Sequence, residues 1–172
     1  MRFDIAPDKQ KNLIIQLYAA FAAAIFLHFV PHSILGTMGL FLIVAVMIAA
    51  YFLRSKSEEH DLMDNHTTYI IRTIWIGSLY LSIGVIAATI LISPRIDQSA
   101  IQGAVDAYLA GDASAIQDPK ILMQLLEDNF NLFIYMGVPL VTPGILFLIY
   151  RCVYGVTRAA KGYRLAKPQS WL

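Results

Sequence analysis

The chain has 172 residues, of which 58% are hydrophobic and 15% are charged, and its mean hydropathy is +0.60. Because soluble domains carry about 25% charged residues, this composition is typical of an integral membrane protein that forms a single domain over residues 1–172. A net charge of +1, without a run of Lys and Arg among aromatic residues, excludes a nucleic-acid-binding protein, and the single cysteine, Cys152, excludes an intramolecular disulfide and a cysteine-cluster metal site.

The first part of the chain predicts two membrane-spanning helices. The first dozen residues are polar and no A-x-A-like cleavage site follows them, so we expect no cleaved signal peptide. An apolar segment over residues 13–30 predicts the first span, since about 20 helical residues cross the hydrocarbon core of a bilayer. Pro31 ends this segment. A second apolar segment, over residues 34–53, follows after a very short link, so the two predict an antiparallel helical hairpin.

Two further spans are expected in the second part of the chain. Residues 54–68 are polar and predict a loop in water. The apolar segment over residues 69–93 predicts the third span, with Arg72 in its first turn, where a long side chain carries its charge to the interface. Residues 132–154 predict the fourth. The expected fold class is therefore all-α, a four-helix transmembrane bundle.

The segment between the third and fourth spans, residues 94–131, is acidic. It holds six carboxylates against two basic residues, a net charge of −4. Its apolar residues recur at helical spacing, which predicts two short amphipathic helices that are broken near Gly111 and Pro119 and lie on the membrane surface or cap the bundle. The residues of the two stripes are Ile101, Val105, Tyr108 and Leu109, and Ile121, Leu122, Leu125 and Leu126.

The basic residues predict the orientation of the chain. With four crossings, 11 of the 13 Lys and Arg residues fall on one side of the membrane, in the N-terminal tail, the central loop with the start of the third span, and the C-terminal end. The positive-inside rule makes that side cytoplasmic. We therefore expect a multi-pass protein of the bacterial inner membrane with both termini in the cytoplasm and the acidic segment in the periplasm.

Two groups of polar residues raise the question of a metal or haem site. His28 and His32 are four residues apart, but Pro31 lies between them and no carboxylate is near in sequence, so interfacial histidines are the favoured interpretation. The segment from Glu58 to His66 is rich in carboxylates, yet its spacing fits no calcium loop. We expect neither a metal nor a cofactor, and a haem or metal carrier is the third choice of function.

The chain is expected not to be an enzyme. It lacks a G-x-S-x-G elbow, a P-loop, an H-E-x-x-H pair and a Gly-rich dinucleotide turn, and its spans contain no carboxylate or lysine. The leading hypothesis is a protein that acts through contacts, as an assembly factor, accessory subunit or scaffold of a larger membrane complex. The alternative is a small oligomeric transporter or channel, in which Pro139, Thr142 and Pro143 open a helix and free carbonyls for a substrate.

Residues 66–77 and 149–172 resemble a family of small bacterial inner-membrane proteins without an assigned biochemical function, which is distantly similar to a membrane component of chloroplast protein import. The family shows a histidine before I-R-T-F-W, an I-x-R-x-x-x-G segment and a closing P-x-T-W-L. This chain departs from the family in Ile74, which replaces an aromatic residue, and in residues 94–131, where the family has a short turn. The resemblance implies the fold and topology but no activity. The matching residues are His66, Ile71, Arg72, Thr73, Trp75, Ile149, Arg151, Gly155, Pro168, Ser170, Trp171 and Leu172.

Four of these residues predict a cluster at the cytoplasmic interface. Arg72 begins one span and Arg151 ends an antiparallel one, so the two are expected at similar depth, with Trp75 and Trp171 beside them. Two arginines at a low-dielectric boundary require an anion. We expect an anionic lipid to supply it in preference to the carboxylates of the central loop. Another membrane protein or a second copy of the chain is expected as a further partner.

Overall fold

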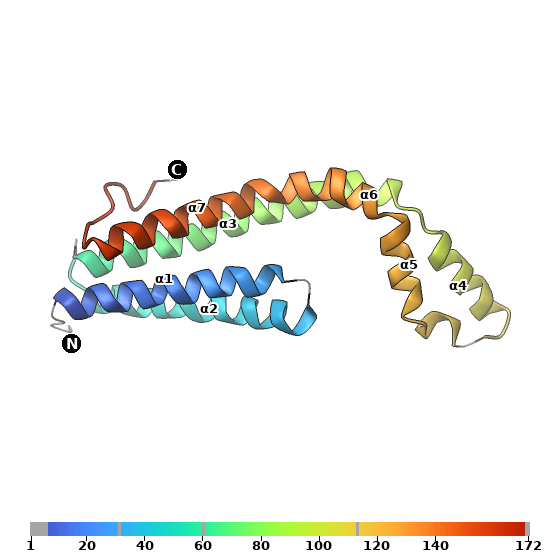
Figure 1. Ribbon diagram of the computed structural model, residues 1–172, viewed down its shortest axis with the longest axis horizontal. Coiled ribbons are helices and arrows are strands. Elements are labelled where there is room, and N and C mark those ends of the chain that lie inside the picture. Colours follow the sequence, from blue (N-terminus) through green and yellow to red (C-terminus); the bar gives the residue numbers. More distant parts are fainter. Residues whose placement is uncertain (1–6, 31, 60, 113, 171–172) are drawn as a thin grey trace. The chain divides into compact units, whose positions relative to one another are not determined.

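The structure is a computed structural model that describes residues 7–30, 32–59, 61–112 and 114–170 (Figure 1). Within these residues every regular element is helical, which confirms the all-α fold class. Four of the helices are long and apolar enough to cross a membrane. They are α1 (Pro7–Phe29), α2 (Ser33–Lys56), α3 (Leu62–Ile92) and α7 (Val138–Ala160), and the fourth apolar stretch continues backward from α7 to Phe130.

The expectation that residues 54–68 form a loop in water is largely wrong. Helix α2 continues to Lys56, and α3 already begins at Leu62. Asp61 initiates α3, because its side chain accepts a hydrogen bond from the backbone N–H of Leu62 at 2.6 Å and its carbonyl accepts one from Asn65 at 3.0 Å. The first turns of α3 contain polar residues, but these do not contact water, because Asn65 and the three residues after it are buried.

The chain divides into two compact units. The first contains the described residues up to Leu79 and those from Gly144 onward, and the second is Tyr80–Pro143. Each long pair of helices is antiparallel, and a glycine in tight contact with the neighbouring helix marks both pairs. A Cβ on Gly39 of α2 would collide with the backbone of His28 on α1, and one on Gly77 of α3 would collide with the side chain of Leu148 on α7.

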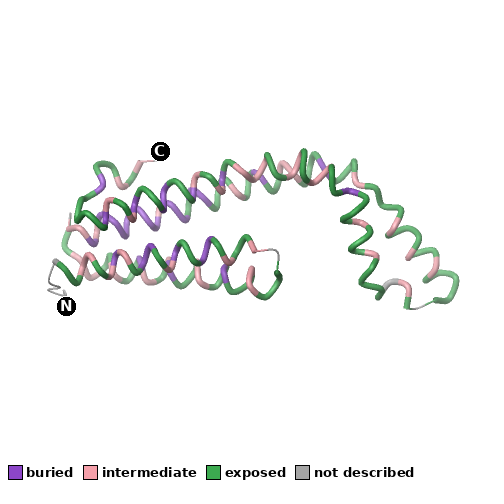
Figure 2. Tube along the Cα trace, viewed as in Figure 1, coloured by how far each residue is buried: buried purple, intermediate pink, exposed green. Residues whose placement is uncertain are grey.

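The core of the first unit lies along the facing sides of α1, α3 and α7, where Figure 2 shows the buried positions. On α1 the buried residues recur every three or four positions, which is the spacing of one helix face. They are Ile14, Leu17, Tyr18, Phe21, Ala24 and Ile25. Many large apolar side chains of α2 and α3 are exposed, such as Phe41 and Ile90. In a chain that spans a membrane, such side chains face lipid.

The second unit contains the ends of α3 and α7 that face each other and a hairpin of two short helices. We call α4 (Ser99–Leu109) and α5 (Lys120–Asp128) together the acidic hairpin. Gly111, with φ of +104°, lies in the turn after α4, and Pro119 precedes α5, as the sequence predicts. The remaining elements are the 3₁₀ turns Ser93–Arg95 and Ala115–Gln117, the short helix α6 (Phe130–Leu132) and a π-helical turn, Phe133–Gly137.

A side-chain amide closes the base of the acidic hairpin. Asn129 is buried, and its Oδ1 accepts a hydrogen bond from the backbone N–H of Asp97 at 2.7 Å. Its Nδ2 donates to the carbonyl of Asp97 at 3.0 Å and to that of Leu125 at 2.9 Å. The Asn129 amide therefore bonds to both the N–H and the carbonyl of Asp97, and these two hydrogen bonds join the start of the hairpin to its end.

The two prolines of the fourth span are accommodated without a break. The π-helical turn ends at Gly137, and the N–H of Val138 donates to the carbonyl of Phe133. One extra residue in this turn shifts the hydrogen-bond pattern just before Pro139, which has no N–H to offer. Thr142 donates its hydroxyl to the carbonyl of Val138 at 2.7 Å, and α7 runs on through Pro143 to Ala160.

Candidate functional site: a polar cluster beneath residues 161–170

The site begins with a hydrogen-bonded pair inside the first unit. The Tyr18 hydroxyl lies 3.1 Å from Nδ1 of His66, and both side chains are buried. Nε2 of His66 lies 3.0 Å from the carbonyl oxygen of Tyr163. Because a carbonyl only accepts, Nε2 carries the proton, and in the neutral imidazole Nδ1 then accepts while the Tyr18 hydroxyl donates. One relay of hydrogen bonds thus joins α1, α3 and the segment that follows α7.

Gly155 on α7 makes room for this pair. A Cβ at position 155 would overlap the hydroxyl and ring carbons of Tyr18. Glycine is costly inside a helix, by about 1 kcal/mol relative to alanine. At this position the cost is offset because only a bare backbone lets the Tyr18 ring reach His66.

Arg151 is the largest fully buried side chain, with 1% of its surface exposed. Its Nε donates to the Thr73 hydroxyl at 3.0 Å, and its Nη1 donates to the carbonyl of Ser170 at 3.1 Å. The guanidinium lies 3.8 Å from the centre of the Tyr69 ring and 5.5 Å from that of Phe147. Within the described residues, therefore, neutral oxygens and aromatic faces stabilise this cation, and its Nη2 has no hydrogen-bond partner.

The segment after α7, residues 161–170, covers this cluster, and we call it the terminal strap. It leaves α7 through Gly162, whose φ of +70° allows the N–H groups of Gly162 and Tyr163 to bond back to the last turn of the helix. Asn65 then holds the strap, donating to the carbonyl of Leu165 at 3.0 Å and accepting from its N–H at 2.8 Å. The buried Leu165 side chain anchors the strap to the core.

The terminal strap ends in a turn that contains another residue of the motif. The N–H of Ser170 donates to the carbonyl of Lys167 at 3.1 Å, which places the half-buried Pro168 at the second position of a four-residue turn. This turn directs the Ser170 carbonyl toward Arg151. The strap thus supplies three carbonyls, from residues 163, 165 and 170, to buried side chains of α3 and α7.

Of the residues that the sequence placed in one interfacial cluster, Trp75 lies away from Arg151. Arg72 is half-buried, and its Nε is a buried atom without a partner among the described residues. Trp75 is 60% exposed and donates its Nε1 hydrogen to the hydroxyl of Tyr51 on α2 at 3.2 Å. Trp75 is two residues from Thr73, about 200° around the helix, so it faces away from Arg151. Trp171 lies outside the described residues.

The carboxylates of the central segment lie elsewhere. Asp64 forms a salt bridge with Arg54 of α2 at 3.4 Å, and Asp61 caps the start of α3. The motif residue Ile71 is buried in the core. We predicted that a lipid, and not one of these carboxylates, supplies the anion for Arg72, and this stays a prediction. Of the carboxylates, Asp64 already pairs with Arg54.

His28 and His32, at the link between α1 and α2, contact nearby backbone groups. Nδ1 of His28 lies 3.3 Å from the carbonyl of Gly36, and Nδ1 of His32 accepts from the N–H of Leu35 at 3.5 Å as the N-cap of α2. In the part of the chain that the structure describes, no group of three or more His, Cys, Asp or Glu side chains is placed to hold a metal ion.

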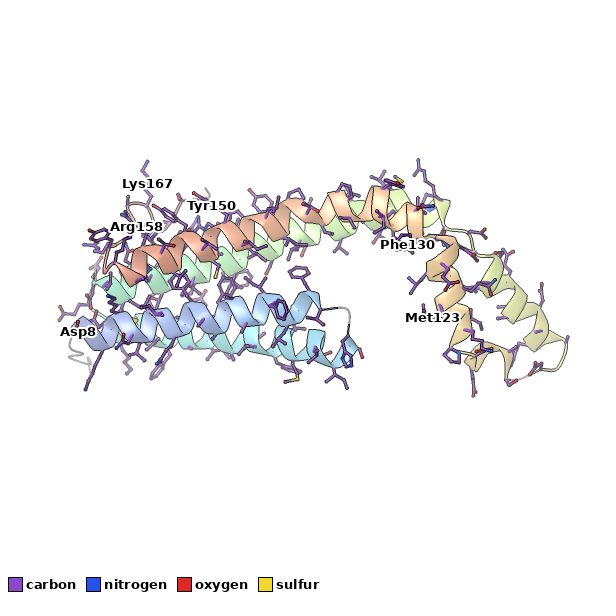
Figure 3. The ribbon with its side chains drawn as sticks, viewed as in Figure 1. Asp8, Met123, Phe130, Tyr150, Arg158 and Lys167 are labelled. Carbon is purple, nitrogen blue, oxygen red and sulfur yellow. The ribbon has the colours of Figure 1, made fainter. Side chains whose placement is uncertain are left out.

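The acidic hairpin presents a second candidate surface. Its large apolar side chains are exposed, with 75% of Leu109 and 58% of Met123 accessible, and Figure 3 labels Met123 on α5. These helices lie between the apolar stretches that end at Arg95 and begin at Phe130. Exposed large apolar side chains are expected where lipid surrounds a helix, but here they occur outside the candidate spans.

Comparison of the chain with protein-family models, curated proteins and solved structures found no match. The polar cluster nevertheless gives a physical reason for the motif residues. His66, Thr73, Arg151 and Gly155 all contribute to the buried cluster beneath the terminal strap, although they are up to 89 positions apart in sequence. Sequence reasoning missed Tyr18 and Asn65, for which the only signals are a hydroxyl in an apolar helix and an amide next to His66.

Proposed function

We propose that the chain is a non-catalytic membrane protein that acts through protein contacts, as an assembly factor, accessory subunit or scaffold of a larger inner-membrane complex. The observation that carries this proposal is the exposed apolar surface of the acidic hairpin, outside the candidate spans. Exposing such a surface to water is unfavourable by about 25 cal/mol for each Å², so a partner that covers it stabilises the complex.

The polar cluster supports the same proposal, because its polar groups are used within the fold. The hydroxyl, imidazole and guanidinium groups form hydrogen bonds within the cluster or with the terminal strap, and the Asn65 amide bonds to the strap, while Nη2 of Arg151 has no partner among the described residues. A buried group that serves the fold in this way is not poised to bind a substrate. What is left for function is the surface of the molecule. We further propose that both termini lie in the cytoplasm and the acidic hairpin in the periplasm, as the basic residues indicate.

Site-specific photocross-linking in intact bacterial cells tests the proposal. A photoreactive residue in place of Leu109 or Met123 should give a discrete protein adduct, whereas one in place of Ser99, which is exposed at the start of α4 outside its apolar stripe, should not. If neither Leu109 nor Met123 gives a protein adduct, the proposal is wrong, and conduction of a solute across liposome membranes by the purified chain would then identify a transporter.

A further inference from the structure

Helix α4 of the acidic hairpin packs against α5 through small side chains. On α4 the half-buried positions are Ala100, Ala104 and Ala107, spaced four and three apart on one face. They face α5, whose half-buried positions are Ile121 and Leu125. Residues of both sets line a cavity of about 410 Å³ between the helices. Alanine therefore provides the inner face of α4, and little apolar area is buried there.

The large apolar side chains lie on the outer faces. In a hairpin that is stable in water by itself, the largest apolar side chains would meet between the helices. Here they are each at least 42% exposed, so the hairpin is built to bury them against something else. The residues of this outer apolar face are Ile101, Val105, Tyr108 and Leu109 on α4, and Leu122, Met123 and Leu126 on α5.

The segment that carries this face is acidic. All six carboxylates of residues 94–131 are exposed, and with Arg95 and Lys120 they leave a net charge of −4. Hydrogen bonds from Ser99 lower the pKa of Asp97, and hydrogen bonds from Ser114 lower the pKa of Asp112, so both carboxylates are ionised at neutral pH. Asp106 and Glu127 lie at the edge of the apolar stripe on their helices, with Lys120 on the same side of α5 as Glu127.

This charge discriminates between the possible occupants of the face. Helices that lie on a bilayer carry Lys and Arg on the polar side, because the membrane surface is negative. An acidic rim is repelled by such a surface. A second copy of the hairpin would bring the same negative charge, and like charges placed opposite each other are unfavourable at an interface. A protein with an apolar centre and basic residues around it complements both features of the hairpin.

We propose that the outer apolar face of the acidic hairpin docks a partner protein whose contact surface is apolar at its centre and rimmed by Lys and Arg. This inference rests on the proposed function and specifies the chemistry of the partner. The apolar contact supplies the area that is withdrawn from water, and the charged rim selects the partner and speeds its association.

The test uses the full chain in neutral detergent micelles and two synthetic helical peptides. Both peptides carry a leucine stripe, flanked by lysines in one and by glutamates in the other. The lysine peptide should bind at least about 10-fold more tightly at low salt, and most of this preference should disappear at about 0.5 M NaCl, where the Debye length is only a few Å. Fluorescence anisotropy of labelled peptides measures both affinities.

Two sets of variants separate the apolar and the charged contributions. Leu109→Ser with Met123→Ser should weaken the binding of both peptides. Asp106→Asn with Glu127→Gln should reduce only the preference for the lysine peptide. All four side chains are exposed, so their replacement leaves the fold intact. The matched control is Glu58→Gln, which removes an exposed carboxylate of the first unit. It should leave the lysine preference unchanged.

Several outcomes would overturn the inference. They are equal affinity for the two peptides, a preference that survives neutralisation of Asp106 and Glu127, and cross-links from position 109 that join two copies, reach lipid or stay within one chain. A protein adduct in cells together with equal peptide affinities would refute the basic rim and leave the proposed function standing. Loss of the adduct in cells would remove the proposed function itself.

Discussion

Replacing Gly155 by alanine should destabilise the first unit through a single added methyl group. The new Cβ would overlap the hydroxyl and ring of Tyr18, so the ring must move away from His66. Overpacking a well-packed core costs about 2 kcal/mol, and leaving Nδ1 of His66 buried without its donor costs about 2 kcal/mol more. Alanine gains about 1 kcal/mol of helix propensity. The expected net loss is therefore about 3 kcal/mol, roughly a 100-fold fall in the ratio of folded to unfolded protein.

The assay is reversible unfolding of the purified chain in mixed micelles, followed by circular dichroism. Gly103→Ala is the matched control, because Gly103 is also helical, but a Cβ there would meet no atom within 4 Å. This control should be neutral or slightly stabilising. Equal effects of the two substitutions would refute the reasoning, since the loss at position 155 would then have nothing to do with Tyr18.

A double-mutant cycle identifies the contact responsible. Tyr18→Phe alone should cost about 1–3 kcal/mol, because the Tyr18 hydroxyl is the donor to His66. In the Gly155→Ala background the hydrogen bond is already lost, so Tyr18→Phe should cost much less. A coupling energy near zero would show that the Tyr18 ring does not move when the methyl group is added.

Three further predictions concern the hairpin, the lipid and the topology. Asn129→Asp keeps an acceptor for the backbone but loses two donated hydrogen bonds, so it should destabilise the base of the hairpin by about 2–3 kcal/mol in hydrogen-exchange measurements, whereas the same change at the exposed Asn131 should have little effect. Arg72→Ala should reduce the amount of anionic lipid that co-purifies, as mass spectrometry can measure, while Glu58→Gln should not; equal losses would argue against a lipid at Arg72. A reporter inserted near Gly111 should be active only as a periplasmic marker and one at the C-terminus only as a cytoplasmic marker, and the reverse pattern would refute the topology.

The four apolar helices were predictable from the sequence because each depends on a local property, a run of apolar residues long enough to cross a bilayer. The start of α3 was not. Its first turns read as a loop because polar residues usually contact water, yet Asn65 and His66 are buried. Their partners are carbonyls of the terminal strap about 100 positions later, and no local pattern announces such a pairing.

The candidate site was predictable only in part for the same reason. The antiparallel arrangement correctly brings residues at the start of α3 close to the end of α7, as the contact between Thr73 and Arg151 shows. Helix geometry alone would also have separated Trp75 from Thr73, since two positions correspond to about 200°. The role of Gly155 required the position of Tyr18 on α1, which depends on tertiary packing.

The polar cluster explains why an arginine can be buried at a place where no carboxylate of the described residues approaches it. A buried ion pair often gains little, since two charges must then leave water. Arg151 instead meets the Thr73 hydroxyl, the Ser170 carbonyl and the Tyr69 ring, which are dipoles and a π face that cost less to bury. These partners come from α3 and the terminal strap, so the cation is stabilised only when both are packed against α7. The terminal strap can therefore bond to Arg151 in this position only when α3 and α7 are paired. In this way Arg151 couples the strap to the core of the first unit.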